Sequence, residues 1–112
     1  MSRPKQKQSY NAEIFRQVCR TMRLPEPQPE FAFHPARKWR IDFYFEANGR
    51  KVALEVEGGV FTGGRHTRAA GFLGDIEKYN HLAMQQIFLV RCTPSNLMKL
   101  ETLNVVKAVL YG

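Results

Sequence analysis

The segment RIDFYFEANGRKVALEV, residues 40–56, constrains the fold of this chain more than any other feature. Hydrophobic and polar residues alternate along residues 40–47 and again along residues 50–56, which is the pattern of β-strands. Asn48-Gly49 separates the two runs, and Asn-Gly in this position is the strongest short-range signal for a two-residue hairpin turn. The sequence therefore predicts an antiparallel hairpin.

The turn also predicts the register of the hairpin. One face, to which Trp39 is expected to belong, carries only apolar facing pairs: Phe45–Val52, Phe43–Leu54 and Ile41–Val56. A slip of one residue would destroy this match, which supports the register. On the other face, Asp42 is expected opposite Glu55, and Arg40 opposite Glu57.

The facing carboxylates of Asp42 and Glu55 need an explanation. Directly opposed residues have Cβ atoms about 4.5–5.5 Å apart, and like charges at that separation are destabilising. A fold tolerates the pair if a cation bridges it, if one group is protonated, or if the strands diverge. Mg²⁺ is one such cation, since it binds hard oxygen ligands, often one or two carboxylates completed by phosphates and waters. The alternative is a solvated polar face on which Arg40 pairs with Glu57.

The rest of the chain predicts helices around this hairpin. Asn11 is a suitable N-cap for an amphipathic helix whose apolar positions extend from Ile14 to Met22. Residues 58–73, rich in glycine, predict a long loop, which in a compact domain is functional or disordered. A helix at 75–85, a buried strand at 86–92 and a final amphipathic helix at 100–111 follow. The order α-β-β-α-β-α predicts a single α/β domain over residues 11–112, with a central mixed sheet flanked by helices.

The charge of the chain favours a polyanionic partner. The formal net charge is +7, and residues 1–40 alone carry nine Lys and Arg against three Glu. Nucleic acid is the partner that such a surface favours, and residues 1–10 are expected to form a flexible basic tail. No apolar run reaches the length of a membrane span, so no membrane partner is expected. The two cysteines, Cys19 and Cys92, predict reduced thiols and a cytoplasmic protein.

The hairpin resembles a known active site. WRIDF and VALEVEGG are similar to the catalytic hairpin of the PD-(D/E)XK nuclease superfamily. The segments FAFHPARKWRIDF, EVEGG, GRHTR, DIEKYN and FLVRCTP extend the resemblance over about residues 30–94. They are similar to small phage and bacterial proteins of the very-short-patch-repair endonuclease and archaeal Holliday-junction resolvase branches. This resemblance implies a restriction-endonuclease-like fold and a Mg²⁺-dependent DNA endonuclease of bacterial or phage-infected cytosol, acting in repair or recombination. Mn²⁺ would substitute for Mg²⁺.

The resemblance also assigns catalytic residues. Asp42 and Glu55 would hold the metal, with the Val56 carbonyl helping, and Glu57 stands where the family usually has Lys. Lys78 is the candidate to replace that missing cation. The carboxylate of Glu57 or the ammonium group of Lys78 would assist the attacking water. Asp75 would orient Lys78 or cap its helix. Glu13, and in second place Glu30, are candidates for an additional acidic ligand.

Basic residues on either side of the hairpin are expected to contact DNA. The predicted nucleic-acid-binding residues are Arg37, Lys38, Arg40, Arg65, His66 and Arg68, with His34 in the same basic stretch. Arginine suits bidentate binding of phosphate, and His66 could also act as a general acid. Trp39 is expected in the core rather than as a stacking platform.

Two alternatives remain open at this stage. Because Glu57 replaces the usual Lys, the chain could be a nuclease-like module that binds nucleic acid without cleaving it. A homodimer through the apolar final helix is a further expectation, and it is compatible with catalysis. A preference for branched or junction DNA is expected from the small size of the chain, because a short chain has little surface for reading long sequences.

Overall fold

The computed structural model describes residues 11–58 and 68–112, with residues 68–72 described by their backbone only. Four strands form one sheet in the order β1-β2-β3-β4: β1 (Gln28–Ala32), β2 (Arg40–Ala47), β3 (Arg50–Val56) and β4 (Ile87–Cys92). The first two pairings are antiparallel and β3–β4 is parallel. The predicted α/β class with a mixed sheet is therefore confirmed.

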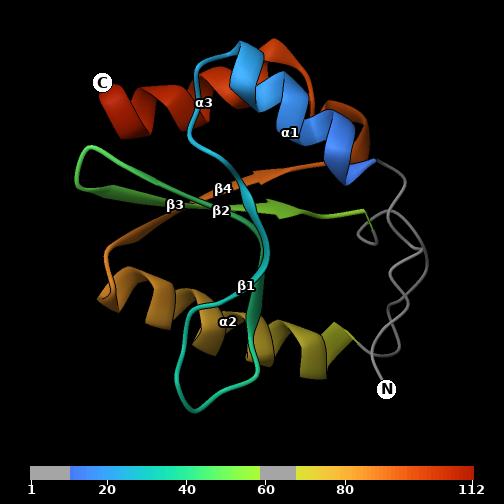
Figure 1. Cartoon of the computed structure of the whole chain (residues 1–112). Helices are drawn as coiled ribbons and strands as arrows, with labels where there is room; N and C mark the ends of the chain where they lie inside the picture. Colours follow the sequence, from blue (N-terminus) through green and yellow to red (C-terminus); the bar gives the residue numbers. More distant parts are fainter. Residues whose placement is uncertain (1–10, 59–67) are drawn as a thin grey trace.

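Helices cover both faces of this sheet. They are α1 (Ala12–Thr21), α2 (Arg68–Met84) and α3 (Leu100–Tyr111), with a short 3-10 helix, η4 (Pro94–Asn96). Helices α1 and α3 lie on one face and α2 lies alone on the other (Figure 1). Among the described helices, none is long and apolar enough to cross a membrane.

The hairpin has the predicted turn and register. Asn48 and Gly49 both have positive φ, 56° and 75°, as a type I′ turn requires. Phe45 pairs with Val52 and Phe43 with Leu54. The turn chemistry and the apolar pattern thus specify the same strand pairing.

Two hydrophobic clusters hold the layers together. The first packs α1 and α3 on the sheet and includes Phe43, Phe45 and Leu54; the second packs α2 on the opposite face and includes Ile41 and Tyr44. The prediction of one apolar face running from Trp39 to Phe45 is therefore wrong. Trp39 and Ile41 pack in the second cluster, because α2 makes this face of the sheet a core as well.

The first helix begins as its sequence predicts. The side chain of Asn11 accepts hydrogen bonds from the backbone N–H groups of Glu13 and Ile14, at 2.8 and 3.2 Å. Phe15 and Cys19 point into the first cluster and are fully buried. The helix therefore covers the sheet with its apolar side, as its residue spacing requires.

Strand β1 was not predicted from the sequence. Its segment follows two prolines and contains a third, Pro29, and prolines indicate the end of a helix more readily than a strand. The structure places β1 at one edge of the sheet, with Pro29 opposite Phe43. An edge strand tolerates proline because one side of it needs no ladder hydrogen bonds.

Helix α2 begins earlier than predicted. Residues 68–73 were expected in a loop, but the helix starts at Arg68. The alanines of this segment favour helix, and glycines inside a helix lower its stability without preventing it. Asp75 therefore lies inside the helix and does not cap it, so that prediction is wrong. The predictions for residues 1–10, Arg65 and His66 lie outside the described residues.

Candidate active site

Asp42 and Glu55 meet where the hairpin ladder ends. The last described β2–β3 pair is Phe43–Leu54, so the predicted pairs beyond it are not part of the ladder. Instead, the Val56 N–H donates to Asp42 Oδ2 at 2.8 Å, and the Asp42 N–H donates to Glu55 Oε2 at 3.3 Å. Side-chain oxygens replace backbone carbonyls as acceptors, and both carboxylates are thereby fixed at the end of the hairpin.

Lys78 reaches the carboxylate of Glu55 from α2. Its Nζ lies 3.3 Å from Oε1 and 3.2 Å from Oε2 of Glu55. The two side chains are only 14% and 10% exposed, so water screens the ion pair weakly. The predicted approach of Lys78 to the hairpin carboxylates is present in the structure.

Burial changes the protonation of Glu55. The residue is 8% exposed, and burial raises the pKa of its carboxyl to about 7. Lys78 lowers this pKa and the charge of Asp42 raises it, but burial has the largest effect. Near neutral pH the carboxyl of Glu55 therefore exchanges between its charged and neutral forms.

Glu57 pairs with Arg91, not with Arg40. Arg91 Nε and Nη2 donate to the two oxygens of Glu57 at 2.7 and 2.8 Å, and the Tyr79 hydroxyl lies 3.4 Å from Glu57 Oε2. Arg40 instead donates to the backbone carbonyl of Glu30 at 3.4 Å. The predicted Arg40–Glu57 pair is wrong, because β4, and not β2, carries the arginine nearest to Glu57.

Sequence reasoning missed Arg91 as a site residue. The parallel register of β3 and β4 sets Arg91 opposite Glu55, and the Glu57 N–H extends this pairing by donating to Cys92 O at 2.7 Å. The signal in the sequence was a charged residue inside the apolar run QIFLVRC, which overlaps the segment FLVRCTP quoted for the resemblance. That signal cannot name a partner, since the partner depends on a register between distant strands.

Two of the acidic residues could hold a divalent cation. Asp42 and Glu55 lie together and offer hard oxygen ligands. Mg²⁺ often binds one or two carboxylates when phosphates and waters complete its coordination shell. Within residues 11–58 and 73–112, no three His, Cys, Asp or Glu side chains gather as a metal-binding group. The pair therefore fits a site that substrate phosphate completes, rather than a cage built by the protein alone.

The predicted additional ligands do not join this pair. Glu13 lies on α1 and forms an ion pair with Arg16 at 3.1 Å, and its role as a metal ligand stays a prediction. Among the described residues, Glu30 does not form a metal-binding group with two other His, Cys, Asp or Glu side chains. Val56 contributes a backbone N–H to the site by binding Asp42.

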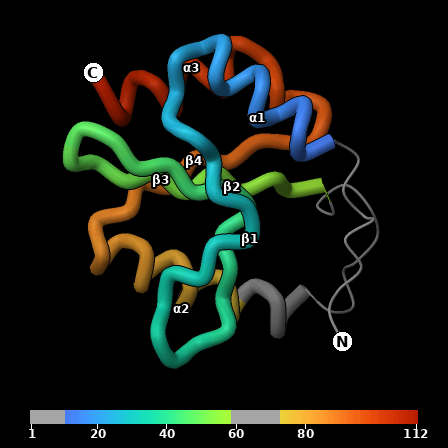
Figure 2. The backbone as a smooth tube through the Cα atoms, viewed as in Figure 1, coloured from blue at the N-terminus to red at the C-terminus, as the bar shows by residue number. Residues whose placement is uncertain are grey.

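The β1–β2 loop carries the basic residues that precede the site, and it runs beside α2 (Figure 2). Arg37 forms an ion pair with Glu77 at 3.0 Å, and its guanidinium carbon lies 3.9 Å from the centre of the Trp39 ring. The Phe33 ring is stacked on Trp39 at 5.9 Å, and Trp39 packs against the second cluster. Lys38 is exposed, and Arg68 is the first residue of α2.

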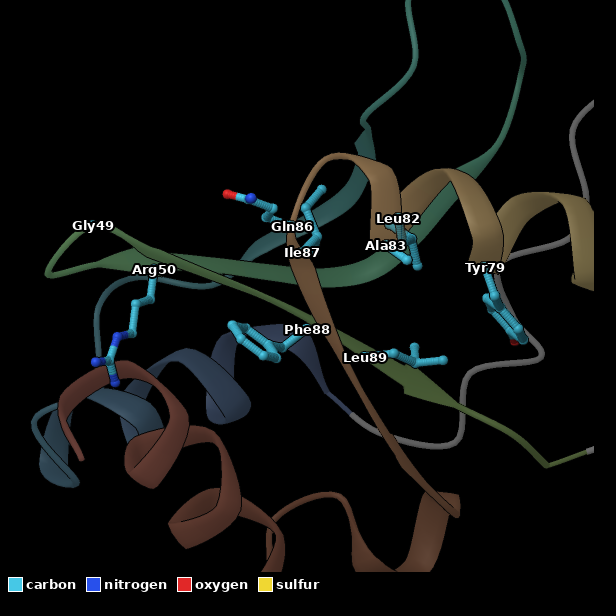
Figure 3. Close-up of a pocket in the computed structure, with 9 residues that line it drawn as sticks. All are labelled: Gly49, Arg50, Tyr79, Leu82, Ala83, Gln86, Ile87, Phe88 and Leu89. Carbon is cyan, nitrogen blue, oxygen red and sulfur yellow. The ribbon is translucent and has the colours of Figure 1, made fainter.

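Two hollows are lined in part by residues of β4. A cavity of about 600 Å³ opens between α2 and β4, with Tyr79 at one end and Gly49 and Arg50 at the other (Figure 3). Its walls are mainly apolar and it contains neither Asp42 nor Glu55. A second hollow of about 310 Å³ adjoins the ion pair of Glu57 and is lined by Glu57, Arg91, Cys92, Thr93 and Asn96.

Both cysteines are free thiols. Burial raises the pKa of Cys19 to about 12 and that of Cys92 to about 11, so neither forms a reactive thiolate at neutral pH. The prediction of unpaired thiols is confirmed, and no nucleophilic role follows for either residue.

Comparison of the chain with protein-family models, with curated proteins and with solved structures gives no match. The functional assignment therefore depends on the residues that meet at the end of the hairpin.

Proposed function

We propose that this protein is a Mg²⁺-dependent endodeoxyribonuclease that hydrolyses phosphodiester bonds. The observation that carries the proposal is the convergence of Asp42, Glu55 and Lys78, which combines two carboxylates with a buried ammonium group. This is the set of groups expected from the resemblance of the hairpin to PD-(D/E)XK nucleases.

In this proposal Asp42 and Glu55 would hold Mg²⁺. The ion would supply charge neutralisation at the phosphoryl group and lower the pKa of a bound water. The Val56 N–H keeps Asp42 Oδ2 in place, so this ligand is oriented before substrate arrives. Mn²⁺, which also accepts carboxylate oxygens, would substitute.

Lys78 has two successive roles in the proposal. Without substrate its ammonium group balances the charge of Glu55, which is otherwise buried beside Asp42. When Glu55 serves as a ligand, the same ammonium group is close enough to donate hydrogen bonds to a phosphate oxygen or to the attacking water. A cation fixed before the reaction stabilises developing negative charge without having to reorganise.

Glu57 has a different role from the other two acidic residues. Both of its oxygens accept hydrogen bonds from Arg91, and one also lies near the hydroxyl of Tyr79. A carboxylate bound in this way is a poor general base. We therefore propose that Glu57 orients Arg91, and that the metal and Lys78 activate the water.

DNA is the proposed substrate and partner. The net charge of +7 favours a polyanion, and the basic stretch formed by Arg37, Lys38 and Arg40 leads directly into Asp42. Arg65, His66 and Arg68 remain proposed phosphate contacts. Branched DNA and a cytosolic location also remain proposals.

We also propose that the chain forms a homodimer through α3. Helix α3 buries Leu103, Val106 and Leu110 in the core, which accounts for much of its apolar character. Leu100, Val105 and Tyr111 are 63%, 49% and 48% exposed and are the large apolar residues of α3 left for a contact. Size-exclusion chromatography with light scattering would measure the mass of the particle in solution. The mass of two chains supports the dimer, and the mass of one chain contradicts it.

One observation favours a second candidate, a nucleic-acid-binding module without catalysis. In the structure Glu55 is paired with Lys78 and Glu57 with Arg91, so both of these carboxylates already have a cationic partner. A protein that had lost its metal would need such pairing to keep buried carboxylates stable.

A panel of labelled DNA substrates separates the two candidates. Supercoiled plasmid, linear duplex, flap and four-way junction would be incubated with the protein in Mg²⁺, in Mn²⁺ and in EDTA. Cleavage that requires the metal supports the nuclease, and the preferred substrate defines its class. Salt-sensitive binding of these DNAs without cleavage in either metal would contradict the nuclease and support the binding module.

A further inference from the structure

Arg91 has the position of a substrate-binding residue. It lies opposite Glu55 in the β3–β4 register, so it stands directly beside one of the two proposed metal ligands. Its side chain is 54% exposed, whereas that of its partner Glu57 is 20% exposed. The guanidinium group is therefore open to solvent at the rim of the candidate site.

The orientation of this guanidinium group is fixed from two sides. Nε and Nη2 bind the carboxylate of Glu57, and the guanidinium carbon lies 5.4 Å from the centre of the Tyr79 ring. Nη1 is not used by Glu57 and retains its donors. A guanidinium with a fixed plane and remaining donors suits the recognition of phosphate oxygens.

The space beside Arg91 has the size and the chemistry for one phosphate group. The hollow of about 310 Å³ is lined by Glu57, Arg91, Cys92, Thr93 and Asn96. Thr93 and Asn96 add neutral hydrogen-bond donors to the positive charge of Arg91. The charge of Glu57 opposes an anion there and offsets the charge of Arg91, so the hydrogen-bond donors of Arg91, Thr93 and Asn96 would hold the phosphate.

We propose that this hollow binds a backbone phosphate of the DNA strand close to the scissile bond, with Arg91 as the residue that contacts it. Glu57 is the partner that holds Arg91 at the mouth of the hollow when no DNA is bound. The inference rests on the proposed function, because the phosphate belongs to the DNA that the nuclease would cleave. It adds a binding residue that neither the hairpin motif nor the basic stretch at Arg37–Arg40 contains.

The test is the salt dependence of DNA binding. Binding of a fluorescent duplex would be measured by anisotropy at several salt concentrations, in EDTA so that no metal-dependent cleavage occurs. The variants are Arg91→Gln, Arg91→Lys and Glu57→Gln. Arg20→Gln is the matched control, since it removes one positive charge and one ion pair from α1, on the opposite face of the sheet.

The inference predicts opposite changes in DNA affinity for the Arg91 and Glu57 variants. Arg91→Gln should weaken binding several-fold and reduce the slope of log K against log salt concentration by about 1, the value for one lost phosphate contact. Arg91→Lys should keep the slope and lose part of the affinity. Glu57→Gln should tighten binding, because the opposing charge disappears while that of Arg91 remains.

An ion pair with only a structural role gives a different pattern. Arg91→Gln would then match Arg20→Gln in slope, or Glu57→Gln would weaken binding as much as Arg91→Gln does, and either result overturns the inference. The two proposals fail separately. Wild-type protein that neither binds DNA in EDTA nor cleaves it in Mg²⁺ overturns the proposed function and this inference with it, whereas wild-type binding with an unaltered slope in Arg91→Gln overturns the inference alone.

Discussion

Lys78 Nζ lies within 3.3 Å of both carboxylate oxygens of Glu55, although the two residues come from different layers of the fold. The contact joins α2 to the hairpin at the point where the β2–β3 ladder ends. It also gives the carboxylate of Glu55 a cationic partner. The pair is therefore both a structural contact and the centre of the proposed chemistry.

Replacing Glu55 should stabilise the protein at alkaline pH. The pKa of Glu55 is raised from 4.5 to about 7, so the folded state binds more protons than the unfolded state between these values. The stabilising contribution of the protonated carboxyl is complete below about pH 4.5 and is lost as pH rises through 7. Glu55→Gln should therefore raise the free energy of unfolding at pH 8 by about 1–3 kcal/mol, and far less at pH 5.

Urea denaturation at pH 5 and pH 8 measures this difference. Glu101→Gln is the control, since Glu101 is an exposed carboxylate on α3 and should show no comparable change with pH. A Glu55→Gln protein that is less stable than wild type at pH 8 would mean that the pairing with Lys78 outweighs burial.

Removing Lys78 should affect catalysis more than folding. Lys78 lowers the pKa of Glu55, so Lys78→Met should move that pKa above 7 and leave the carboxyl neutral and tolerable inside the protein. The rate of DNA cleavage should fall by about 10²-fold or more, the usual cost of losing one group that stabilises a transition state. Lys78→Arg should recover part of the rate. Lys107→Met on α3 provides the control, and an unchanged cleavage rate in Lys78→Met would exclude a catalytic role for Lys78.

Metal binding should compete with protonation of Glu55. Mg²⁺ requires the ionised carboxylate, so its affinity should fall as pH drops below about 7. Because a ligand bound only to the folded state raises the melting temperature, Mg²⁺ should raise it more at pH 8 than at pH 6. Differential scanning fluorimetry with and without Mg²⁺ measures both shifts. Equal shifts at the two pH values, or shifts that persist in Asp42→Asn, would place the metal elsewhere.

Two glycine substitutions should change stability in opposite directions. An added Cβ would meet no atom within 4 Å at Gly49 or at Gly74, so the two sites differ mainly in backbone conformation. Gly49 has φ 75°, and Gly49→Ala should destabilise the protein by about 1 kcal/mol. Gly74 lies inside α2, and Gly74→Ala should stabilise it by up to about 1 kcal/mol. Thermal unfolding of both variants checks the hairpin turn, and a stabilised Gly49→Ala protein would contradict the positive φ.

Local patterns made much of the fold predictable. The turn at Asn48-Gly49, the register of Phe43 with Leu54 and the Asn11 cap depend on residues close together in the sequence. Strand β1 was missed because its stability comes from pairing with β2, while its prolines indicate a break. The true start of α2 was missed because glycines near that end of the helix resemble loop composition.

The candidate site was predictable only in part. Hairpin arithmetic predicts that Asp42 and Glu55 lie close together, although the ladder ends before this pair, and Lys78 follows from the resemblance. Arg91 depends on the parallel register between β3 and β4, which are separated by the whole of α2. The pairing of Glu57 with Arg91 in place of Arg40 has the same cause, since non-local strand order decides which cation is nearest.

The most direct test of the central claim is nicking of supercoiled plasmid in Mg²⁺ by wild-type protein and by Asp42→Asn. Asparagine keeps an acceptor for the Val56 N–H, so the variant removes the charge of Asp42 while preserving the local hydrogen bond. Glu101→Gln, purified in the same way, controls for contaminating nucleases and for the loss of one carboxylate. The account predicts nicking by wild type and Glu101→Gln that EDTA abolishes, and none by Asp42→Asn. Nicking at the wild-type rate by folded Asp42→Asn would contradict it.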